Sequence, residues 1–430
     1  MQGGVVYNYV MEGSTIGQIK ALRCRECGRE YPATLIYACE DCFAPLDVVY
    51  EYDRIALTAD ALTGRPKTLW RYIELLPIAD PSHAVDLGAG LTPLHRASRL
   101  GEALGIDELF VKNDTVNPTF SFKDRPTSVA ISKALEFGLS AVGCASTGNL
   151  AAAVSAHAAK AGLPCYVIVP ADTELNKTVQ ASAYGATIIA VQGTYDEANR
   201  LAMQVADDYG WGFVNFNIRP YYVEGSKTLA YEVCEQLNWT PPDHVVIPIG
   251  SGALLCANYK GFNELRAVGL IDDVEIKISG AQPVGCSPVV SAFNAESEFV
   301  EPIEYPDTLA KSLAIGDPGD GLYAVRRIRE TGGYAQSATD PEIVAAIKLL
   351  AKTEGIFSEP AGAVTVAALK RLVERGEVAS DERVVCYVTG NGLKTPDAIL
   401  GHLPRPVEIE PRLDAFTAAI GVKEVTPWSR

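Results

Sequence analysis

The sequence predicts an α/β protein in which parallel sheets are covered by helices on both faces. Strand-like runs alternate with segments whose apolar residues repeat at helical spacing, from Glu108 to Val388. Strands joined by helices pair in parallel, and such sheets are buried on both sides. Hydrophobic residues make up 48% and charged residues 21% of the 430 residues, a composition typical of folded globular domains. This length predicts two or three domains.

The net charge of −16 argues against electrostatic binding to nucleic acid or to an anionic membrane surface. No apolar run approaches the roughly 20 residues that a bilayer-spanning helix needs. The first residues, MQGG, have neither the basic segment nor the apolar segment of a signal peptide. We therefore expect a cytoplasmic protein that acts on a small molecule, with neither nucleic acid nor membrane as a partner.

Four of the ten cysteines form two CxxC pairs near the start of the chain, Cys24 with Cys27 and Cys39 with Cys42. Two such pairs place four thiolates where a tetrahedral metal ion can be held, which favours a structural zinc. A metal-free thiol pair or a redox site is the alternative, because the separation is shorter than in many zinc ribbons. The other six cysteines are scattered and are expected to be reduced and buried.

The main body follows in a regular order of elements. The expected strands are 108–112, 141–145, 165–169, 187–191, 245–249, 275–279 and 384–388. The expected helices are 95–104, 126–138, 150–160, 174–184, 195–209, 253–266, 340–353 and 361–375. In the fifth of these helices, Leu201 and Val205 repeat at helical spacing. Ligands of parallel sheets bind at the carboxyl ends of strands, so the strand-to-helix loops are the candidate sites.

The segment 117–125, with the sequence NPTFSFKDR, places Lys123 between aromatic residues and a helix start. One interpretation is a solvated lysine in the first turn of a helix. The other is a lysine in an apolar pocket, where loss of its proton costs little and allows Schiff-base chemistry. These nine residues alone leave both interpretations open.

Three strand-to-helix loops offer groups for a ligand. The loop after strand 141–145 carries Ser146, Thr147 and Asn149 at a helix start, where free amides meet anions, although a simple capped turn is also possible. The loop 250–254, GSGAL, suits a small phosphate monoester and matches neither dinucleotide nor P-loop motifs. Thr389 ends the last strand with one hydroxyl.

Other catalytic motifs are absent from the sequence. The five histidines are widely spread without HExxH spacing, and there is no GxSxG elbow. No cysteine lies in a recognisable nucleophile motif. The chemistry is therefore expected to need an organic cofactor.

Taken together, the motifs resemble the fold-type II pyridoxal-phosphate enzymes, and most closely the threonine synthases. The motifs that carry the resemblance are NPTFSFKDR at 117–125, ASTGN at 145–149, the glycine turn at 250–254, EGSKTLAYEV at 224–233, KSLAIGDP at 311–318, EGIFSEPAGAV at 354–364 and TGNGLK at 389–394. They occur in the order of that family. The early cysteine pairs look like the ribbon of archaeal and bacterial members.

The resemblance implies pyridoxal 5′-phosphate (PLP) as the cofactor and gives roles to residues of these motifs. Lys123 would hold PLP covalently and then act as the catalytic base, Asn149 would bind the ring 3′-oxygen, and Thr389 would face the ring nitrogen. The 5′-phosphate would be held by Gly250, Ser251, Gly252, Ala253 and Leu254. The substrate carboxylate would be bound by Ser146 and Thr147.

The implied reaction converts O-phospho-L-homoserine and water into L-threonine and phosphate, as part of threonine biosynthesis. Family members commonly have an arginine for the substrate phosphate where this chain has Tyr222. Arg219, with help from Asn217, is expected to bind that phosphate instead. Because of this departure, a paralogue such as cysteate synthase or a serine/threonine dehydratase-like lyase is the alternative. A cofactor-free scaffold is a third hypothesis.

The resemblance also implies two three-layer parallel-sheet domains behind a zinc-ribbon-like module, and a homodimer. We expect the module at 1–52, a large PLP-binding domain at 53–114 and 221–405, a small domain at 115–220 and a tail at 406–430.

Overall fold

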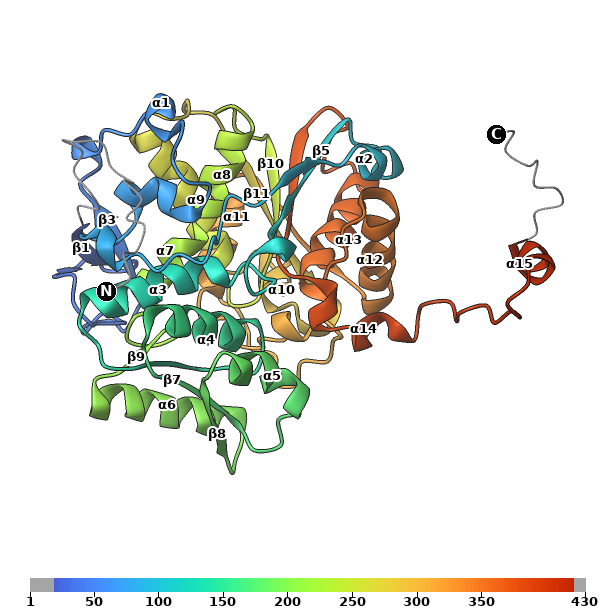
Figure 1. The fold of residues 1–430 in the computed structure, drawn as a ribbon. Helices are drawn as coiled ribbons and strands as arrows, with labels where there is room; N and C mark the ends of the chain where they lie inside the picture. Colours follow the sequence, from blue (N-terminus) through green and yellow to red (C-terminus); the bar gives the residue numbers. More distant parts are fainter. Residues whose placement is uncertain (1–18, 421–430) are drawn as a thin grey trace.

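The structure, a computed structural model, describes residues 19–420 and is built around two parallel sheets (Figure 1). The N-terminal part of the predicted module, 1–18, and the end of the tail, 421–430, lie outside the described residues. The α/β prediction with two helix-covered parallel sheets is confirmed. Between residues 19 and 420, no helix has the length and apolar character that crossing a membrane requires.

The larger sheet has six strands. In order across the sheet they are β12 (Ala335–Ala338), β11 (Lys277–Pro283), β10 (His244–Pro248), β13 (Arg383–Val388), β5 (Glu108–Asn113) and β4 (Leu94–Arg96). The first five are parallel, so their carboxyl ends meet at one edge. One face is covered by α2 (Ser98–Leu104), α12 (Asp340–Glu354) and α13 (Pro360–Glu374), and the other by α8 (Thr228–Gln236), α9 (Ala253–Ala267) and α11 (Gly321–Glu330) (Figure 1).

The prediction of one helix over 95–104 is wrong at its beginning. Leu94–Arg96 forms edge strand β4, which pairs antiparallel with β5 and places Leu94 opposite Lys112. Helix α2 begins only at Ser98 and ends before Gly105, whose φ of 78° closes the helix. Pairing with β5 satisfies the backbone of 94–96, which local helical spacing could not foresee.

The smaller sheet has four parallel strands between helices. They are β8 (Thr187–Val191), β7 (Cys165–Pro170), β6 (Val142–Ala145) and β9 (Gly212–Phe213). Above and below this sheet lie α3 (Asp124–Glu136), α4 (Asn149–Ala161), α5 (Leu175–Ala183) and α6 (Tyr195–Tyr209) (Figure 1). The capping box of Thr194 and Glu197 fixes the start of α6 as the sequence predicts.

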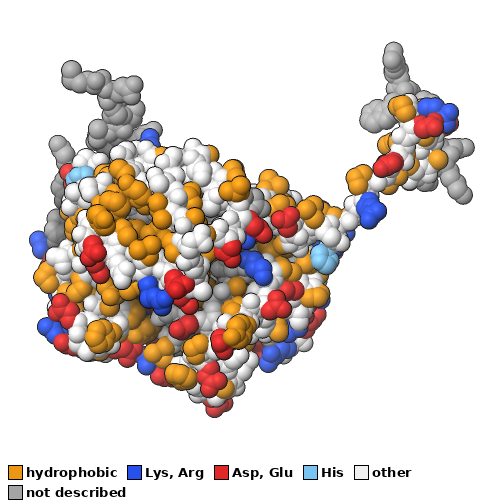
Figure 2. All heavy atoms as spheres, turned by 90° about the horizontal axis from the view of Figure 1, so that it is seen from below, with side chains coloured by type: hydrophobic (Ala, Val, Ile, Leu, Met, Phe, Trp, Pro, Cys, Tyr) orange, Lys and Arg blue, Asp and Glu red, His pale blue; other side chains and the backbone are white. Residues whose placement is uncertain are grey.

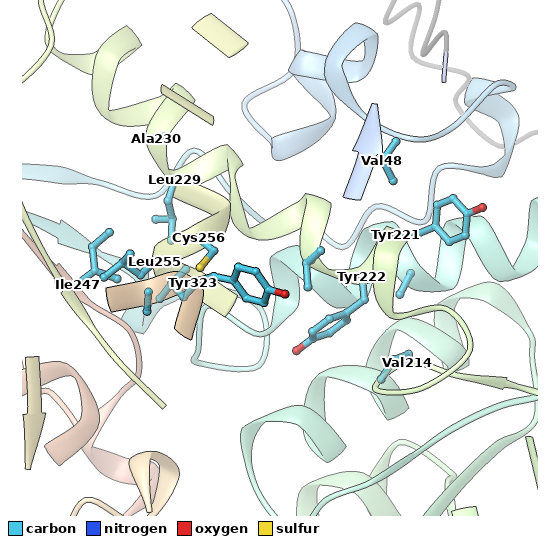
Figure 3. Close-up of a cluster of buried hydrophobic side chains, with 14 of the residues drawn as sticks. Val48, Val214, Tyr221, Tyr222, Leu229, Ala230, Ile247, Leu255, Cys256 and Tyr323 are labelled. Atoms are coloured by element: carbon cyan, nitrogen blue, oxygen red, sulfur yellow. The ribbon is translucent and has the colours of Figure 1, made fainter. Parts of the chain in front are cut away.

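A small antiparallel sheet precedes the body and consists of β1 (Ile19–Cys24), β2 (Glu30–Tyr31) and β3 (Leu46–Tyr50). It packs on α7 (Arg219–Ser226) and α9. Figure 3 shows the shared apolar cluster, in which Val48 of β3 lies near Tyr221 of α7, and Cys256 of α9 lies near Tyr323 of α11. This module and the cavity described below therefore share one buried cluster.

The remaining α-helices of the described residues are α1 (Ala59–Leu62), α10 (Pro288–Asn294), α14 (Asp397–Leu400) and α15 (Leu413–Ile420). The exposed chain after α14 reaches away from the body and carries α15 (Figures 1 and 2). On the face in Figure 2, acidic and basic side chains are mixed with apolar ones, without a broad basic patch. This agrees with the negative net charge of the chain.

Candidate active site

A cavity of about 590 Å³ is lined by residues from both sheets' strand-to-helix loops. The loop after β6 contributes Ser146, Thr147 and Asn149, and Thr389 follows β13. The turn after β10 contributes Gly250, Ser251, Gly252, Ala253 and Leu254. Lys123 and Arg219 line the same cavity. Segments that are distant in sequence are thus brought to one place.

Lys123 is half-buried and surrounded by aromatic side chains, so it is not the freely solvated lysine of the first interpretation. Its Nζ donates to the hydroxyl of Tyr222 at 3.0 Å. The same Nζ lies 4.8 Å from the ring centroid of Phe122 and 5.6 Å from that of Tyr222. These cation–π contacts and the hydrogen bond hold the amine at the cavity wall.

The backbone around Lys123 is attached to the loop after β13. The amide of Phe122 donates to the carbonyl of Thr389 at 2.8 Å, and the amide of Asn391 donates to the carbonyl of Phe120 at 3.0 Å. Phe120 has a φ of 67°, a conformation that a bulky side chain rarely adopts. The two loops therefore hold Lys123 and Thr389 in a fixed relation across the cavity.

Asn149 donates its side-chain amide to both carboxyl oxygens of Glu359, at 3.0 and 3.1 Å. Glu359 is buried, lines the cavity and directly precedes α13. Burial raises the pKa of Glu359 to about 7, although the Asn149 hydrogen bond and the charges of Lys394 and Lys123 oppose that rise. Glu359 is a site residue that the sequence reasoning missed. A carboxylate before proline at a strongly apolar helix start was the available signal.

The turn after β10 has the backbone that an anion site needs. Gly252 has a φ of 92°, and a Cβ there would lie 2.7 Å from the carbonyl oxygen of Asp320. Only glycine fits this position. The following helix α9 begins at Ala253, so its first amides have no acceptor within the helix and point toward the turn.

Arg219 and Asn217 differ in their placement. Arg219 begins α7, lines the cavity and forms an ion pair with Asp320. Asn217 accepts from the amide of Phe213 at 2.9 Å and donates to the carbonyl of Trp211 at 2.8 Å. Its side chain is committed to the backbone beside β9, and the cavity lining does not include it. Asn217 is therefore not brought together with Arg219 as we expected.

The four early cysteines lie together in the N-terminal module. Their sulfurs are all within 4.8 Å of one another, with Cys24 and Cys42 at 3.4 Å and Cys27 and Cys39 at 3.6 Å. A tetrahedron with zinc–sulfur bonds of about 2.3 Å has sulfur separations of about 3.8 Å. The four thiols therefore fit a tetrahedral metal ion.

The two cysteine turns have the same backbone design. The amide of Gly28 donates to the carbonyl of Cys24, and the amide of Phe43 donates to that of Cys39. Gly28 has a φ of 73°, and Phe43 adopts 59° where no glycine is present. The second turn therefore has the same shape as the first although it lacks a glycine. A bulky residue adopts such a φ only when its surroundings require it.

Comparison with known proteins agrees with this site. The family model for the pyridoxal-phosphate dependent enzyme family matches residues 85–390. The threonine synthase of Methanocaldococcus jannaschii is 43% identical, over 90% of this chain and 96% of that protein. The threonine synthase of Methanosarcina acetivorans is 40% identical, over 93% and 98%, and that of Mycobacterium tuberculosis is 38% identical, over 80% and 94%.

Solved structures show the same fold at lower identity. Threonine deaminase isoform 2 from Solanum lycopersicum superposes with a TM-score of 0.63 at 23% identity, over 78% of this chain and 94% of that one. Diaminopropionate ammonia lyase from Escherichia coli gives 0.62 at 19% identity, over 74% and 88%. With the close relatives over nearly the full length, the chain belongs to the pyridoxal-phosphate dependent enzymes and, within them, to the threonine synthase family.

Proposed function

We propose that this chain converts O-phospho-L-homoserine and water into L-threonine and phosphate with PLP as its cofactor. The observation that carries the proposal is one cavity that combines Lys123, the glycine turn after β10 and Arg219. These are a nucleophilic amine, a cradle for the cofactor phosphate and a cation for a substrate phosphate. Two relatives named threonine synthase, 43% and 40% identical, support it.

The cavity residues fit PLP. Gly252, whose φ and whose close approach to Asp320 exclude a side chain, and the first turn of α9 offer backbone amides to a phosphate. Asn149 would turn its amide from Glu359 to the ring 3′-oxygen, and buried Thr389 would offer a neutral hydroxyl to the ring nitrogen. A neutral partner does not enforce protonation of that nitrogen, which suits elimination and replacement. When bound, PLP supplies the electron sink for the substrate carbons.

The other residues act on the substrate. Lys123 would hold the cofactor and then carry protons at Cα and Cβ of the substrate. Ser146 and Thr147, at the start of α4, would hold the carboxylate. Arg219 would bind the phosphate that leaves, and we no longer include Asn217 in this role because its side chain holds the backbone beside β9.

The alternative is a paralogue with another substrate, such as cysteate synthase or a serine/threonine dehydratase-like lyase. The observation that supports this alternative is Tyr222, which stands where an arginine is common in the family. Its hydroxyl accepts a hydrogen bond from Lys123. The test is turnover of O-phospho-L-homoserine and O-phospho-L-serine by the same purified protein. We expect phosphate release from phosphohomoserine, whereas turnover of phosphoserine alone would favour the paralogue.

We also propose that Cys24, Cys27, Cys39 and Cys42 hold a structural zinc ion. The fit of their sulfurs to a tetrahedron supports it, and four protein ligands leave no open position for catalysis. We expect one zinc per chain by mass spectrometry of the native protein. Cys27→Ser should lose most of the metal and unfold at lower temperature, because metal binding stabilises such modules.

A matched control for this prediction is Cys144→Ser, which alters a buried cysteine of β6, outside the cluster. This variant should keep its zinc whatever its stability. Metal-free native protein, or a disulfide within the cluster, would contradict the zinc proposal.

The Glu359 carboxyl predicts a pH dependence of stability. Its folded pKa of about 7 lies above the value near 4.3 in an unfolded chain. The unfolded state therefore ionises first, so wild-type stability falls by about 4 kcal/mol as pH rises from about 4 to 7 and then levels off. Glu359→Gln lacks this loss. In cofactor-free protein, its urea midpoint should exceed that of wild type at pH 8 and match it at pH 4.

An exposed carboxylate provides the control for this measurement. Glu374 ends α13 on the surface, where it pairs with Lys370, and Glu374→Gln should follow wild type at both pH values. If the urea midpoints of Glu359→Gln and wild type differ by the same amount at pH 4 and at pH 8, the pKa of Glu359 is not raised in the folded protein, and the prediction is wrong.

The domain division, location and assembly complete the proposal. We keep a ribbon module at 1–52, a large domain at 53–114 and 221–405, a small domain at 115–220 and a tail from 406, which the three separate sheets support. A cytoplasmic location is supported by the ten free cysteines, since reduced thiols are typical of that compartment. The family resemblance supports a homodimer.

A further inference from the structure

Asp320 is a completely buried carboxylate that lies between two arginines from different parts of the chain. Arg25 Nη1 donates to Asp320 Oδ1 at 2.6 Å, and Arg219 Nη2 donates to the other oxygen, Oδ2. Arg25 belongs to the N-terminal module, whereas Arg219 lines the active-site cavity. One carboxylate thus joins the module to the residue proposed to bind the substrate phosphate.

Arg25 is itself held firmly in the module. It lies between Cys24 and Cys27, and its amide donates to the carbonyl of Pro45 at 3.1 Å. Its Nε and Nη2 donate to Asp47 Oδ1 at 2.9 and 2.7 Å. The guanidinium also lies 5.1 Å from the ring centroid of Tyr323, and its side chain is only 9% exposed. The cysteine turn and these contacts therefore fix the position of the Arg25 guanidinium.

The four charged groups alternate in sign in the order Asp47, Arg25, Asp320 and Arg219. Burial alone would raise the pKa of Asp47, but the charge and hydrogen bonds of Arg25 outweigh burial and lower it. The positive end of this row, Arg219, faces the cavity. Because Arg25 occupies one oxygen of Asp320, Arg219 meets the other oxygen through one nitrogen and keeps further donors for an anion.

Asp320 also contacts the glycine turn after β10. Its amide donates to the carbonyl of Ser251 at 2.8 Å, and its carbonyl lies over Gly252. The backbone of Asp320 thus supports the proposed cofactor-phosphate cradle, while its side chain holds the proposed substrate-phosphate cation. The cavity lining does not include Arg25, and its hydrogen bond to Asp320 links it to Arg219.

We propose that Arg25, acting through Asp320, positions Arg219 for the substrate phosphate, so that the cysteine module contributes a positioning residue to the active site. The inference rests on the proposed role of Arg219 as the phosphate-binding residue. Without Arg25, the buried Asp320 carboxylate has one cation left and takes both donor groups of the Arg219 fork. The guanidinium is then drawn out of the cavity.

The test compares ligands that differ in phosphate, with the PLP-loaded enzyme throughout. Arg25→Met should weaken binding of inorganic phosphate about 10-fold by titration calorimetry and raise KM for phosphohomoserine similarly, with kcat within about twofold. Binding of L-threonine, which has no phosphate, should stay within twofold of wild type. Arg25→Lys keeps one positive charge toward Asp320, so its affinity for phosphate should lie between those of wild type and Arg25→Met.

Two controls separate positioning from general damage. Arg23 lies two residues before Arg25, on β1, but pairs with Glu30 at the surface, so Arg23→Met should match wild type. In an Arg219→Met background, Arg25→Met should cause no further loss of phosphate binding, because both act through one group. Should Arg25→Met fail to fold, Arg25→Lys carries the same comparison of phosphate with L-threonine.

Phosphate binding that is independent of Arg25, or an equal loss of phosphate and L-threonine, would overturn the inference. Additive losses in the double variant would also overturn it, as would a wild type that binds no phosphate. If wild type binds phosphate in an Arg25-dependent way but does not turn over phosphohomoserine, the inference stands and the proposed function fails.

Discussion

Lys123→Ala is expected to lower turnover by more than about 10⁴-fold, since covalent attachment of the cofactor and proton transfer are both lost. The amine lies at the cavity wall, 3.0 Å from the Tyr222 hydroxyl and against two aromatic rings. Alanine leaves no nucleophile at that point. Lys123→Arg should be equally inactive, because it keeps the charge but cannot form the covalent bond.

The measurement pairs steady-state turnover with peptide mass spectrometry after borohydride reduction. In wild type, the cofactor mass should be found on the peptide that contains Lys123 and should be absent in both variants. Lys160→Ala, at the exposed end of α4, is the control and should behave as wild type. Activity above about 1% in Lys123→Ala would remove this lysine from the chemistry.

Glu232→Ala is expected to cost about 3 to 5 kcal/mol of stability, because it removes a carboxylate that two buried cations share. Glu232 is fully buried, accepts from Arg125 Nη2 at 2.7 Å and lies 2.6 Å from Lys112 Nζ. Arg125 also pairs with Asp114 at 2.6 Å. Since Arg125 follows Lys123 by two residues, this network also supports the helix start beside the site.

The pH dependence gives this prediction a second signature. Burial alone would raise the pKa of Glu232, but Arg125 and Lys112 outweigh burial and lower it to about 2. A lowered pKa means that the carboxylate stabilises the fold above the unfolded pKa near 4.3, and that this contribution is lost as pH falls toward 2. The difference in urea midpoint between wild type and Glu232→Ala should therefore be larger at pH 7 than at pH 3.

The control for the stability measurement is an exposed carboxylate. Glu374→Ala removes a surface partner of Lys370 and should change stability by less than about 0.5 kcal/mol. A loss below about 1 kcal/mol for Glu232→Ala would mean that the protein relaxes around the two cations, contrary to a rigid network.

Most of the fold follows from local patterns in the sequence. The strand Thr187–Val191 and the helix Tyr195–Tyr209 have the bounds that periodicity predicts, because they are flanked by clear turns and caps. The prediction failed at Leu94–Arg96, where pairing with β5 decides the structure. Strands β9 and β12 escaped prediction because each is short and gains its partners only in the assembled sheets.

The candidate site shows the same limit. Asn149, Thr389 and the turn after β10 were expected in the site because each follows a strand end, and Lys123 because its motif before α3 resembles that of the family; the structure brings all of them to one cavity. Asn217 was placed in the site from its position near Arg219, yet its amide serves the neighbouring backbone. The contact of Arg25 with Asp320 joins residues 295 positions apart, and no local pattern marks it.

The most direct test of the proposed function is the fate of solvent oxygen when the enzyme acts on O-phospho-L-homoserine in ¹⁸O-labelled water. If the phosphate leaves by cleavage of the carbon–oxygen bond and water then adds at Cβ, the L-threonine carries one ¹⁸O in its hydroxyl group and the released phosphate carries none. Mass spectrometry of both products gives the answer in one experiment. Label in the phosphate would show simple hydrolysis, and a 2-oxo acid in place of threonine would show a dehydratase-like lyase; either result would contradict the proposal.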